Sequence, residues 1–185
     1  FIHKKIDALN IDLPDNSVDV FICTHMIHHI SHPVKFLKSL EKKLVDGGLI
    51  LIQDINTSFF MRVLLYLMKH EGFSYNNNIF DESKAANNSN DPWAANCAIP
   101  QLLFQDSKLF EKKVPLKILK NSLNEFLLLP FSGGVIAKYK TIQLPIFVLK
   151  LIDLFDRIMI YFFPKLFAFG RSVVLKKESG SNKIN

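Results

Sequence analysis

The stretch VDVFICTHMIHHISHPVKFLKSLEKKLVDGGLILIQDI, residues 18–55, decides the fold because its hydrophobic period changes twice. Residues 18–25 are mainly β-branched or aromatic and follow the turn cluster LPDNS, so they predict a strand buried on both faces. Residues 49–55 form a second apolar run of the same kind. Between them, from Pro33 onward, apolar residues recur at helical spacing, and the glycine pair 47–48 is expected to end the helix. Strand, helix and strand joined by short turns predict a parallel pair in an α/β fold.

The rest of the chain divides into segments of different character. Residues 59–70 predict another helix, and residues 115–126 and 171–178 predict two further strands. The segment 73–93 is rich in asparagine and serine and has no hydrophobic period, which predicts a lid loop or a disordered loop. Residues 179–185 predict a disordered tail.

The segment 144–170 is apolar enough to suggest a membrane span, but its charges argue against one. Lys150, Asp153 and Arg157 share one helical face, which makes the segment amphipathic. Each charge at the centre of a bilayer costs roughly 2.5 to 3.5 kcal/mol on insertion scales. The segment is therefore expected to pack on the sheet, on a partner or at a membrane interface.

The composition bears on the class of partner. The net charge of +6 comes almost wholly from lysines, and Arg62, Arg157 and Arg171 lie far apart in sequence. Nucleic-acid-binding proteins usually concentrate basic residues on one element, so no nucleic-acid partner is predicted. Cys23 and Cys97 show no CxxC spacing, which indicates reduced thiols and a cytoplasmic protein, with a peripheral position at the inner face of the membrane left open.

Residues 7–54 resemble the central part of the class I S-adenosylmethionine-dependent methyltransferases, of the type 11 kind. In that family an Asp-Ala pair follows the third strand, and an LP-D-S-D run leads into the fourth. A His-His pair comes next, and a helix that ends in Leu and Gly-Gly feeds the fifth strand. All these features occur here in the same order. The resemblance implies a Rossmann-like methyltransferase fold with strand order 3-2-1-4-5-7-6, methyl transfer as the activity and S-adenosylmethionine as the cofactor.

One part of the family pattern is missing from the chain. A methyltransferase of this class opens with a strand, a glycine-rich turn and an acidic residue after the next strand. The Gly-Gly pairs at 47–48 and 133–134 follow a helix and lie in a late loop, so neither is that turn. The resemblance therefore implies that residues 1–178 are the C-terminal part of a methyltransferase domain, truncated before its third strand and inactive alone.

The resemblance also implies which residues form the site. Asp7 and Ala8 match the pair that contacts adenine, although Asp7 could instead be a surface residue in a turn. Thr24 and His25 end a strand at the carboxyl edge, where ligands bind in open α/β sheets, and they are expected to contact the cofactor. His29 would lie at the mouth of the pocket, where a neutral imidazole could orient or deprotonate a nucleophile.

The histidines could also be ligands of a metal ion. Four of them fall at helical spacing, namely His25, His28, His29 and His32. The strand-to-helix break and Pro33 interrupt that spacing, so no metal is predicted. Asp54 ends the second strand and is expected either to face the pocket edge or to cap the next helix.

The later segments bear on the methyl acceptor. WAANCAIPQLLF (93–104) and RSVVLKK (171–177) resemble the tail of a subgroup often encoded among bacterial surface-polysaccharide or lipid-linked sugar genes. This resemblance implies a small or lipid- or sugar-linked acceptor. The alternative is a non-catalytic remnant that binds a partner or a membrane surface through residues 144–170. A dinucleotide oxidoreductase is disfavoured because it needs the same glycine turn.

Overall fold

A computed structural model describes residues 6–8, 10–69, 71–88, 91, 94–131 and 143–179. Its sheet has the order β1-β2-β4-β3, and the strands are β1 (Val18–Thr24), β2 (Leu44–Ile55), β3 (Lys117–Asn124) and β4 (Gly170–Lys176). β1 runs parallel to β2, whereas β4 runs antiparallel to both β2 and β3. This order confirms the 4-5-7-6 part of the expected strand order.

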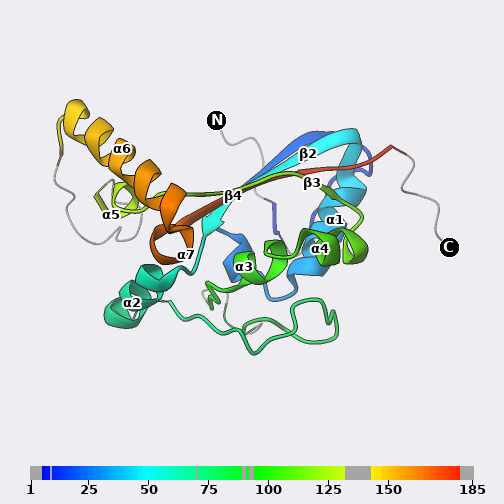
Figure 1. Cartoon of the computed structure of the whole chain (residues 1–185). Coiled ribbons are helices and arrows are strands. Elements are labelled where there is room, and N and C mark those ends of the chain that lie inside the picture. The colour runs from blue at the N-terminus through cyan, green and yellow to red at the C-terminus, as the bar shows by residue number, and fades with distance from the viewer. Residues whose placement is uncertain are drawn as a thin grey trace.

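The helices lie mainly on one side of this sheet and at one end of it (Figure 1). α1, α3 and α4 lie below the sheet in that view, and α2, α6 and α7 gather at the far end from α1. The helices are η1 (Ile27–His29), α1 (Pro33–Lys43), α2 (Phe59–Met68), α3 (Ile99–Phe104), α4 (Ser107–Lys113), α5 (Leu128–Phe131), α6 (Ile146–Phe162) and α7 (Pro164–Phe167).

α1 begins as its sequence predicts and ends earlier than expected. Pro33 occupies its first turn, where a missing N–H costs nothing, and the helix buries its apolar face. It ends at Lys43, however, because the fully buried Leu44 already starts β2. The two glycines lie within β2. Gly47 has a φ of 79°, and a Cβ at Gly48 would lie 2.9 Å from the carbonyl oxygen of Val45.

The prediction that the first strand is buried on both faces is wrong. Cys23 is 3% exposed and faces the core, whereas Val20 is 44% and Ile22 is 72% exposed on the opposite face. The physical reason is the placement of the helices. Among the described residues, helices cover β1 on one face only (Figure 1).

The described part of segment 73–93 contains no helix or strand, yet it is anchored to the core. Ile79 and Ala86 are 5% and 2% exposed and pack in the main hydrophobic cluster. The Asn96 side chain accepts from the N–H groups of Ser74 and Ala98 at 2.9 and 3.1 Å. It donates to the carbonyls of Ser74 and Ala86 at 3.1 and 3.2 Å. One buried amide therefore holds both ends of residues 74–86.

Several sequence expectations fall outside the described residues. These are four positions of the loop (89, 90, 92 and 93), the second Gly-Gly pair (133–134) and nearly all of the tail (180–185).

Replacement of Asn96 by alanine should loosen this loop. Each net hydrogen bond contributes roughly 0.5 to 1.5 kcal/mol, so the loss of four should lower the free energy of unfolding by about 2 to 6 kcal/mol. Urea denaturation measures that loss, and limited proteolysis should cut residues 73–88 sooner in Asn96→Ala than in the natural chain. Asn76→Ala is the control, because Asn76 is exposed. Equal stability of the two variants would show that Asn96 does not anchor the loop.

Candidate functional site

The carboxyl ends of β1 and β2 meet at one edge of the sheet. Thr24 is exposed at the last position of β1. His25 has a φ of 48°, and its N–H donates to the carbonyl of Gln53 at 2.8 Å. The chain thus turns sharply after Thr24 while it remains bonded to β2. Ligands of open α/β sheets bind at this kind of edge.

Asp7 and Ala8 lie in a separate turn that precedes β1. The carbonyl of Asp7 accepts from the N–H of Asn10 at 3.1 Å, and Asp7 is exposed. Ala8 is half-buried and packs against the main core. The turn leaves both interpretations of Asp7 open, an adenine contact or a surface turn.

His29 is the half-exposed member of the histidine pair. Its Nδ1 lies 3.2 Å from the carbonyl oxygen of Ala94, to which it can donate. Its Nε2 lies 3.8 Å from Oε1 of Glu71. The ring is therefore held between two segments that follow β2.

A buried network beside His29 was not predicted from the sequence. Asp54 is 0% exposed, and its carboxylate lies 2.5 Å from Nδ1 of His28. It also accepts from the N–H groups of Ile27 and Ile55 at 2.8 and 2.7 Å. Asp54 therefore neither faces a pocket nor caps α2, and both expectations for it are wrong. The carboxylate instead fixes the turn between β1 and α1.

Glu71 closes this network on its outer side. Its Oε2 lies 3.7 Å from Nε2 of His28 and accepts from the Cys97 thiol at 3.3 Å. Burial alone would lower the pKa of His28, but Asp54 and Glu71 outweigh it and raise that pKa to about 9. His28 in turn lowers the pKa of Glu71 to about 2. Burial raises the pKa of the Cys97 thiol, which leaves it protonated.

His28, His29 and Glu71 also have the composition of a metal site. Each can offer one ligand atom, and the three atoms lie within 4.8 Å of one another. A protonated His28 has no lone pair to offer a metal, and its charge already accounts for the position of Glu71. We therefore interpret the group as a buried ion pair. His25 and His32 do not belong to it.

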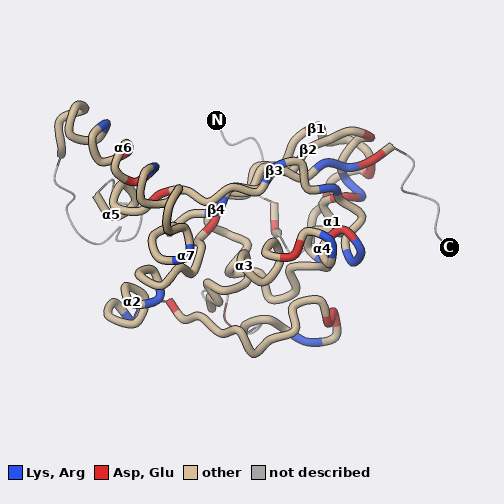
Figure 2. The backbone as a smooth tube through the Cα atoms, viewed as in Figure 1, with Lys and Arg blue, Asp and Glu red and all other residues tan. Residues whose placement is uncertain are grey.

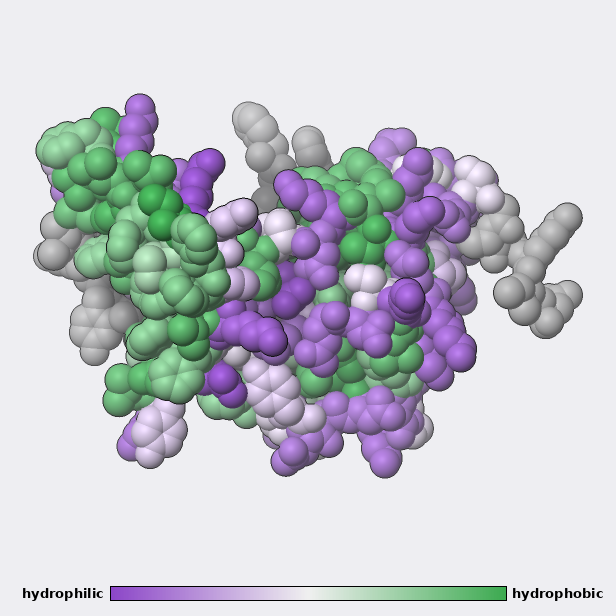
Figure 3. Space-filling model, viewed as in Figure 1, coloured by the Kyte–Doolittle hydropathy of each residue, from purple (hydrophilic) through white to green (hydrophobic). Residues whose placement is uncertain are grey.

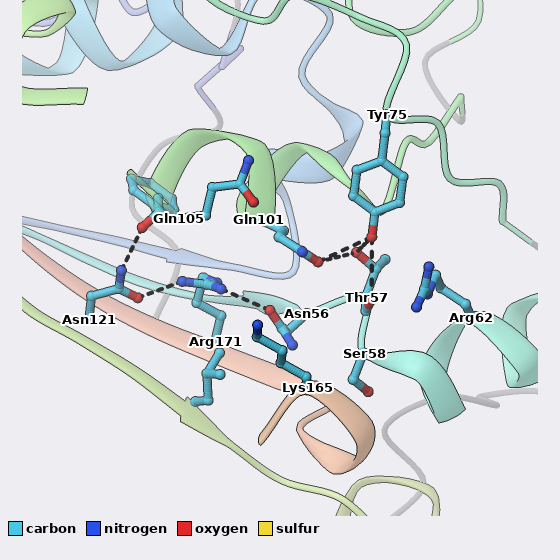
Figure 4. Close-up of a pocket in the computed structure, with 12 residues that line it drawn as sticks. Asn56, Thr57, Ser58, Arg62, Tyr75, Gln101, Gln105, Asn121, Lys165 and Arg171 are labelled. Atoms are coloured by element: carbon cyan, nitrogen blue, oxygen red, sulfur yellow. Dashed lines mark hydrogen bonds between the residues drawn. The ribbon is translucent and has the colours of Figure 1, made fainter. Parts of the chain in front are cut away.

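A cavity of about 640 Å³ begins one residue after the end of β2 (Figure 4). Tyr75 comes from the predicted lid loop and Lys165 from the predicted amphipathic segment. None of the five predicted site residues is among those that line it, which are Asn56, Thr57, Ser58, Arg62, Tyr75, Gln101, Phe104, Gln105, Asn121, Leu123, Lys165 and Arg171. The run of three polar residues directly after a buried strand is the sequence signal that could have located it.

Known structures show a similar path of the chain. A SAM-dependent methyltransferase from Archaeoglobus fulgidus is 17% identical, with a TM-score of 0.48 over 89% of this chain and 62% of that protein. The cyclase SpnF is 14% identical, with a TM-score of 0.45 over 96% and 57%. A methyltransferase from Mesorhizobium loti is 11% identical, with a TM-score of 0.43 over 94% and 68%. The chain thus spans about three fifths of the first two proteins. No curated protein sequence matches it.

The family comparison concerns the segment that decides the fold. Residues 2–52 match the family model described as a methyltransferase domain, a match that includes the turn at Asp7, all of β1 and α1 and most of β2. This match supports the methyltransferase family expected from the sequence, and the parallel β1–β2 pair within the mixed sheet supports the expected Rossmann-like α/β fold. Residues 2–52 therefore resemble a methyltransferase domain, as the sequence motifs predicted.

Proposed function

We propose that the intact protein transfers a methyl group from S-adenosylmethionine to a small or lipid- or sugar-linked acceptor. One observation carries this proposal. The segment that matches the methyltransferase family ends within β2, and a polar cavity starts at the residue that follows this strand. The acceptor would occupy that cavity and extend toward the carboxyl ends of β1 and β2, where its nucleophile would meet the cofactor.

The four residues predicted to bind the cofactor suit its adenosyl part. Asp7 is exposed and could accept from an exocyclic amine, and Ala8 offers a backbone amide next to it. Thr24 and His25 stand where β1 ends, so they would border the same ligand. When bound, the cofactor supplies an electrophilic methyl group.

His29 is the residue that we assign to the acceptor's nucleophile. Donation from its Nδ1 to the Ala94 carbonyl would leave the lone pair on Nε2. His28 holds Glu71, and Glu71 lies beside that nitrogen, so His28 and Glu71 are positioning residues. Methyl transfer depends mainly on in-line alignment, and His29 can serve by orienting the nucleophile or by removing its proton.

Methyl transfer can be tested on the full-length product of the gene, with radiolabelled S-adenosylmethionine and extracts of small molecules and lipids as acceptors. Asp7→Asn should weaken cofactor binding by about tenfold, because it removes a charged acceptor. His29→Ala should lower kcat by about 100-fold and leave cofactor affinity unchanged. Asp46→Asn, at the opposite end of β2, is the control. Failure to label any acceptor, or equal affinities of the Asp7 and Asp46 variants for the cofactor, would refute these assignments.

The buried His28 predicts how stability changes with pH. Its pKa is raised from 6.5 to about 9, so its contribution to stability is complete below pH 6.5 and is lost as the pH rises through about 9. Urea unfolding should therefore show a fall in the free energy of unfolding between pH 6.5 and 9.5. His28→Gln should flatten this part of the curve, and His32→Gln, outside the network, should keep it. The same slope in His28→Gln would contradict the ion pair.

We propose as a second function that the chain contacts an anionic lipid surface. Within the described residues, no helix combines the length and the apolar character needed to span a bilayer. α6 nevertheless exposes much of its apolar face, with Phe147 at 64%, Leu151 at 62% and Phe162 at 66%. Figure 3 shows an apolar region that extends over α6, α7 and α2.

Aromatic contacts make this apolar region continuous. Phe59 contacts Phe60, which stacks on Phe167 with ring centroids 5.1 Å apart. Phe167 contacts Phe163, and Phe163 contacts Phe162 with centroids 6.3 and 6.4 Å apart. We call these five rings, which run from α2 through α7 to the end of α6, the aromatic row.

Basic residues border the aromatic row and the apolar face of α6. Lys150 and Arg157 lie on α6, Lys165 on α7 and Arg62 on α2, and all four are exposed. Figure 2 shows basic positions on these three helices. Arg157 pairs with Asp153 at 2.9 Å, which offsets part of this charge. Apolar side chains bordered by cations favour the interface of an anionic membrane.

Vesicle flotation tests this contact directly. The chain should bind vesicles of phosphatidylglycerol and phosphatidylcholine and bind pure phosphatidylcholine vesicles more weakly. Leu151→Ser combined with Phe162→Ser should reduce binding by at least about tenfold, since each large apolar side chain contributes roughly 1.5 to 3 kcal/mol on burial. Ile22→Ser is a matched control, because Ile22 is equally exposed on β1. Equal loss in the control would argue against a contact through α6.

A further inference from the structure

The cavity after β2 carries positive charge that its lining does not neutralise. Arg62, Lys165 and Arg171 line it, and its described lining contains no aspartate or glutamate. Arg62 and Lys165 are exposed at its rim, whereas Arg171 is only 7% exposed at its floor. Figure 4 shows these cations entering the cavity from α2, α7 and β4.

Neutral amides hold the guanidinium of Arg171. One terminal nitrogen donates to Oδ1 of Asn121 at 2.8 Å, and the other donates to Oδ1 of Asn56 at 3.0 Å (Figure 4). Asp54 faces Arg171 across β2 and β4, but its carboxylate is engaged by His28 and two backbone amides. Burial lowers the pKa of Arg171 to about 10, which still leaves it charged at neutral pH. A buried cation without a carboxylate partner is costly, and a bound anion would remove that cost.

Two buried polar groups of the same cavity are unsatisfied in the described structure. Nε of Arg171 donates to no acceptor, and the hydroxyl of Ser58, which is 4% exposed, has no partner. Ser58 precedes the ten-residue helix α2 and does not cap it with its side chain, and no acidic residue occupies the first turn. The amino end of α2 thus adds its backbone N–H groups and partial positive charge to the cavity.

We propose that this cavity binds a phosphate group, carried as a monoester or diester by the molecule that occupies it. The donors exceed what a carboxylate with two oxygens can use, because two guanidinium groups, an ammonium, a hydroxyl and a helix terminus converge there. The assignment of the phosphate compound as the methyl acceptor rests on the proposed function. The binding of phosphate to the cavity does not depend on that function.

Titration of the 185-residue chain at constant ionic strength tests the inference without the cofactor. The ligands are inorganic phosphate, glycerol 3-phosphate and dihexanoylphosphatidylglycerol below its micellar concentration, and calorimetry and thermal shift are the readouts. We expect saturable one-to-one binding and a rise in Tm with phosphate that equal chloride does not give. Binding of all three ligands would identify the phosphate group itself as the determinant, and binding of the lipid alone would identify a lipid headgroup. Absence of saturable binding by any of them would overturn the inference.

Variants at the rim keep this test independent of folding. Arg62→Gln and Lys165→Gln should each weaken binding by about threefold to tenfold, because both side chains are exposed and screened. Lys69→Gln, an exposed cation at the end of α2 outside the cavity, should bind as the natural chain does. Ser58→Ala should also weaken binding, and it removes a hydroxyl that has no hydrogen-bond partner among the described residues. Equal affinities in all four variants would overturn the inference.

The two proposals can fail separately. If phosphate binds as expected and the full-length product methylates nothing, the phosphate site stands and the methyltransferase activity fails. If the full-length product methylates an acceptor and the 185-residue chain binds none of the three phosphate ligands, the activity stands and the phosphate inference fails.

Discussion

The buried carboxylate of Asp54 is the constraint on which the functional edge of the sheet depends. A carboxylate with no exposure to water must gain its hydrogen bonds from the protein. It gains them from the N–H groups of Ile27 and Ile55 and from the ring of His28. These bonds hold the start of η1 against the end of β2, so they fix the path of the chain after Thr24.

Asp54 and Arg171 show how two buried charges of opposite sign can face each other and stay separate. They are paired in the register of β2 and β4. The bonds of Asp54 lie within a closed network whose cation is His28. Within the part of the chain that the structure describes, the guanidinium of Arg171 donates to the amide oxygens of Asn56 and Asn121. The negative charge of Asp54 is thus compensated within the protein by His28. The positive charge of Arg171 instead gives a positive potential to a cavity that a solute can enter.

The cavity and the aromatic row share residues, which links the two surfaces. Lys165 lies between Phe163 and Phe167 in sequence and also lines the cavity. Arg62 has the same double position on α2, about one helical turn after Phe59. A phosphate compound that arrived from a lipid surface would therefore meet these cations before it reached Arg171. A soluble phosphate compound would meet the same residues from the solvent.

The sequence by itself determined the local elements and the order of the last four strands. Residues 18–25, the helix from Pro33 and residues 49–55 carry periods that are set by neighbouring residues. β1 formed within one position of its expected bounds, whereas β2 begins five residues earlier than expected. The family resemblance was determined there too, because its motifs lie in one continuous stretch. Only the tertiary structure decided that one face of β1 stays open, that α1 stops at Lys43 and that Asp54 is buried. It also joined Ser58, Arg62, Lys165 and Arg171 around one cavity, from segments more than one hundred residues apart. The hydrophobic period of a segment does not predict which distant residues will lie together. These residues come together because β4 runs antiparallel beside β2, which places Arg171 at the carboxyl end of β2.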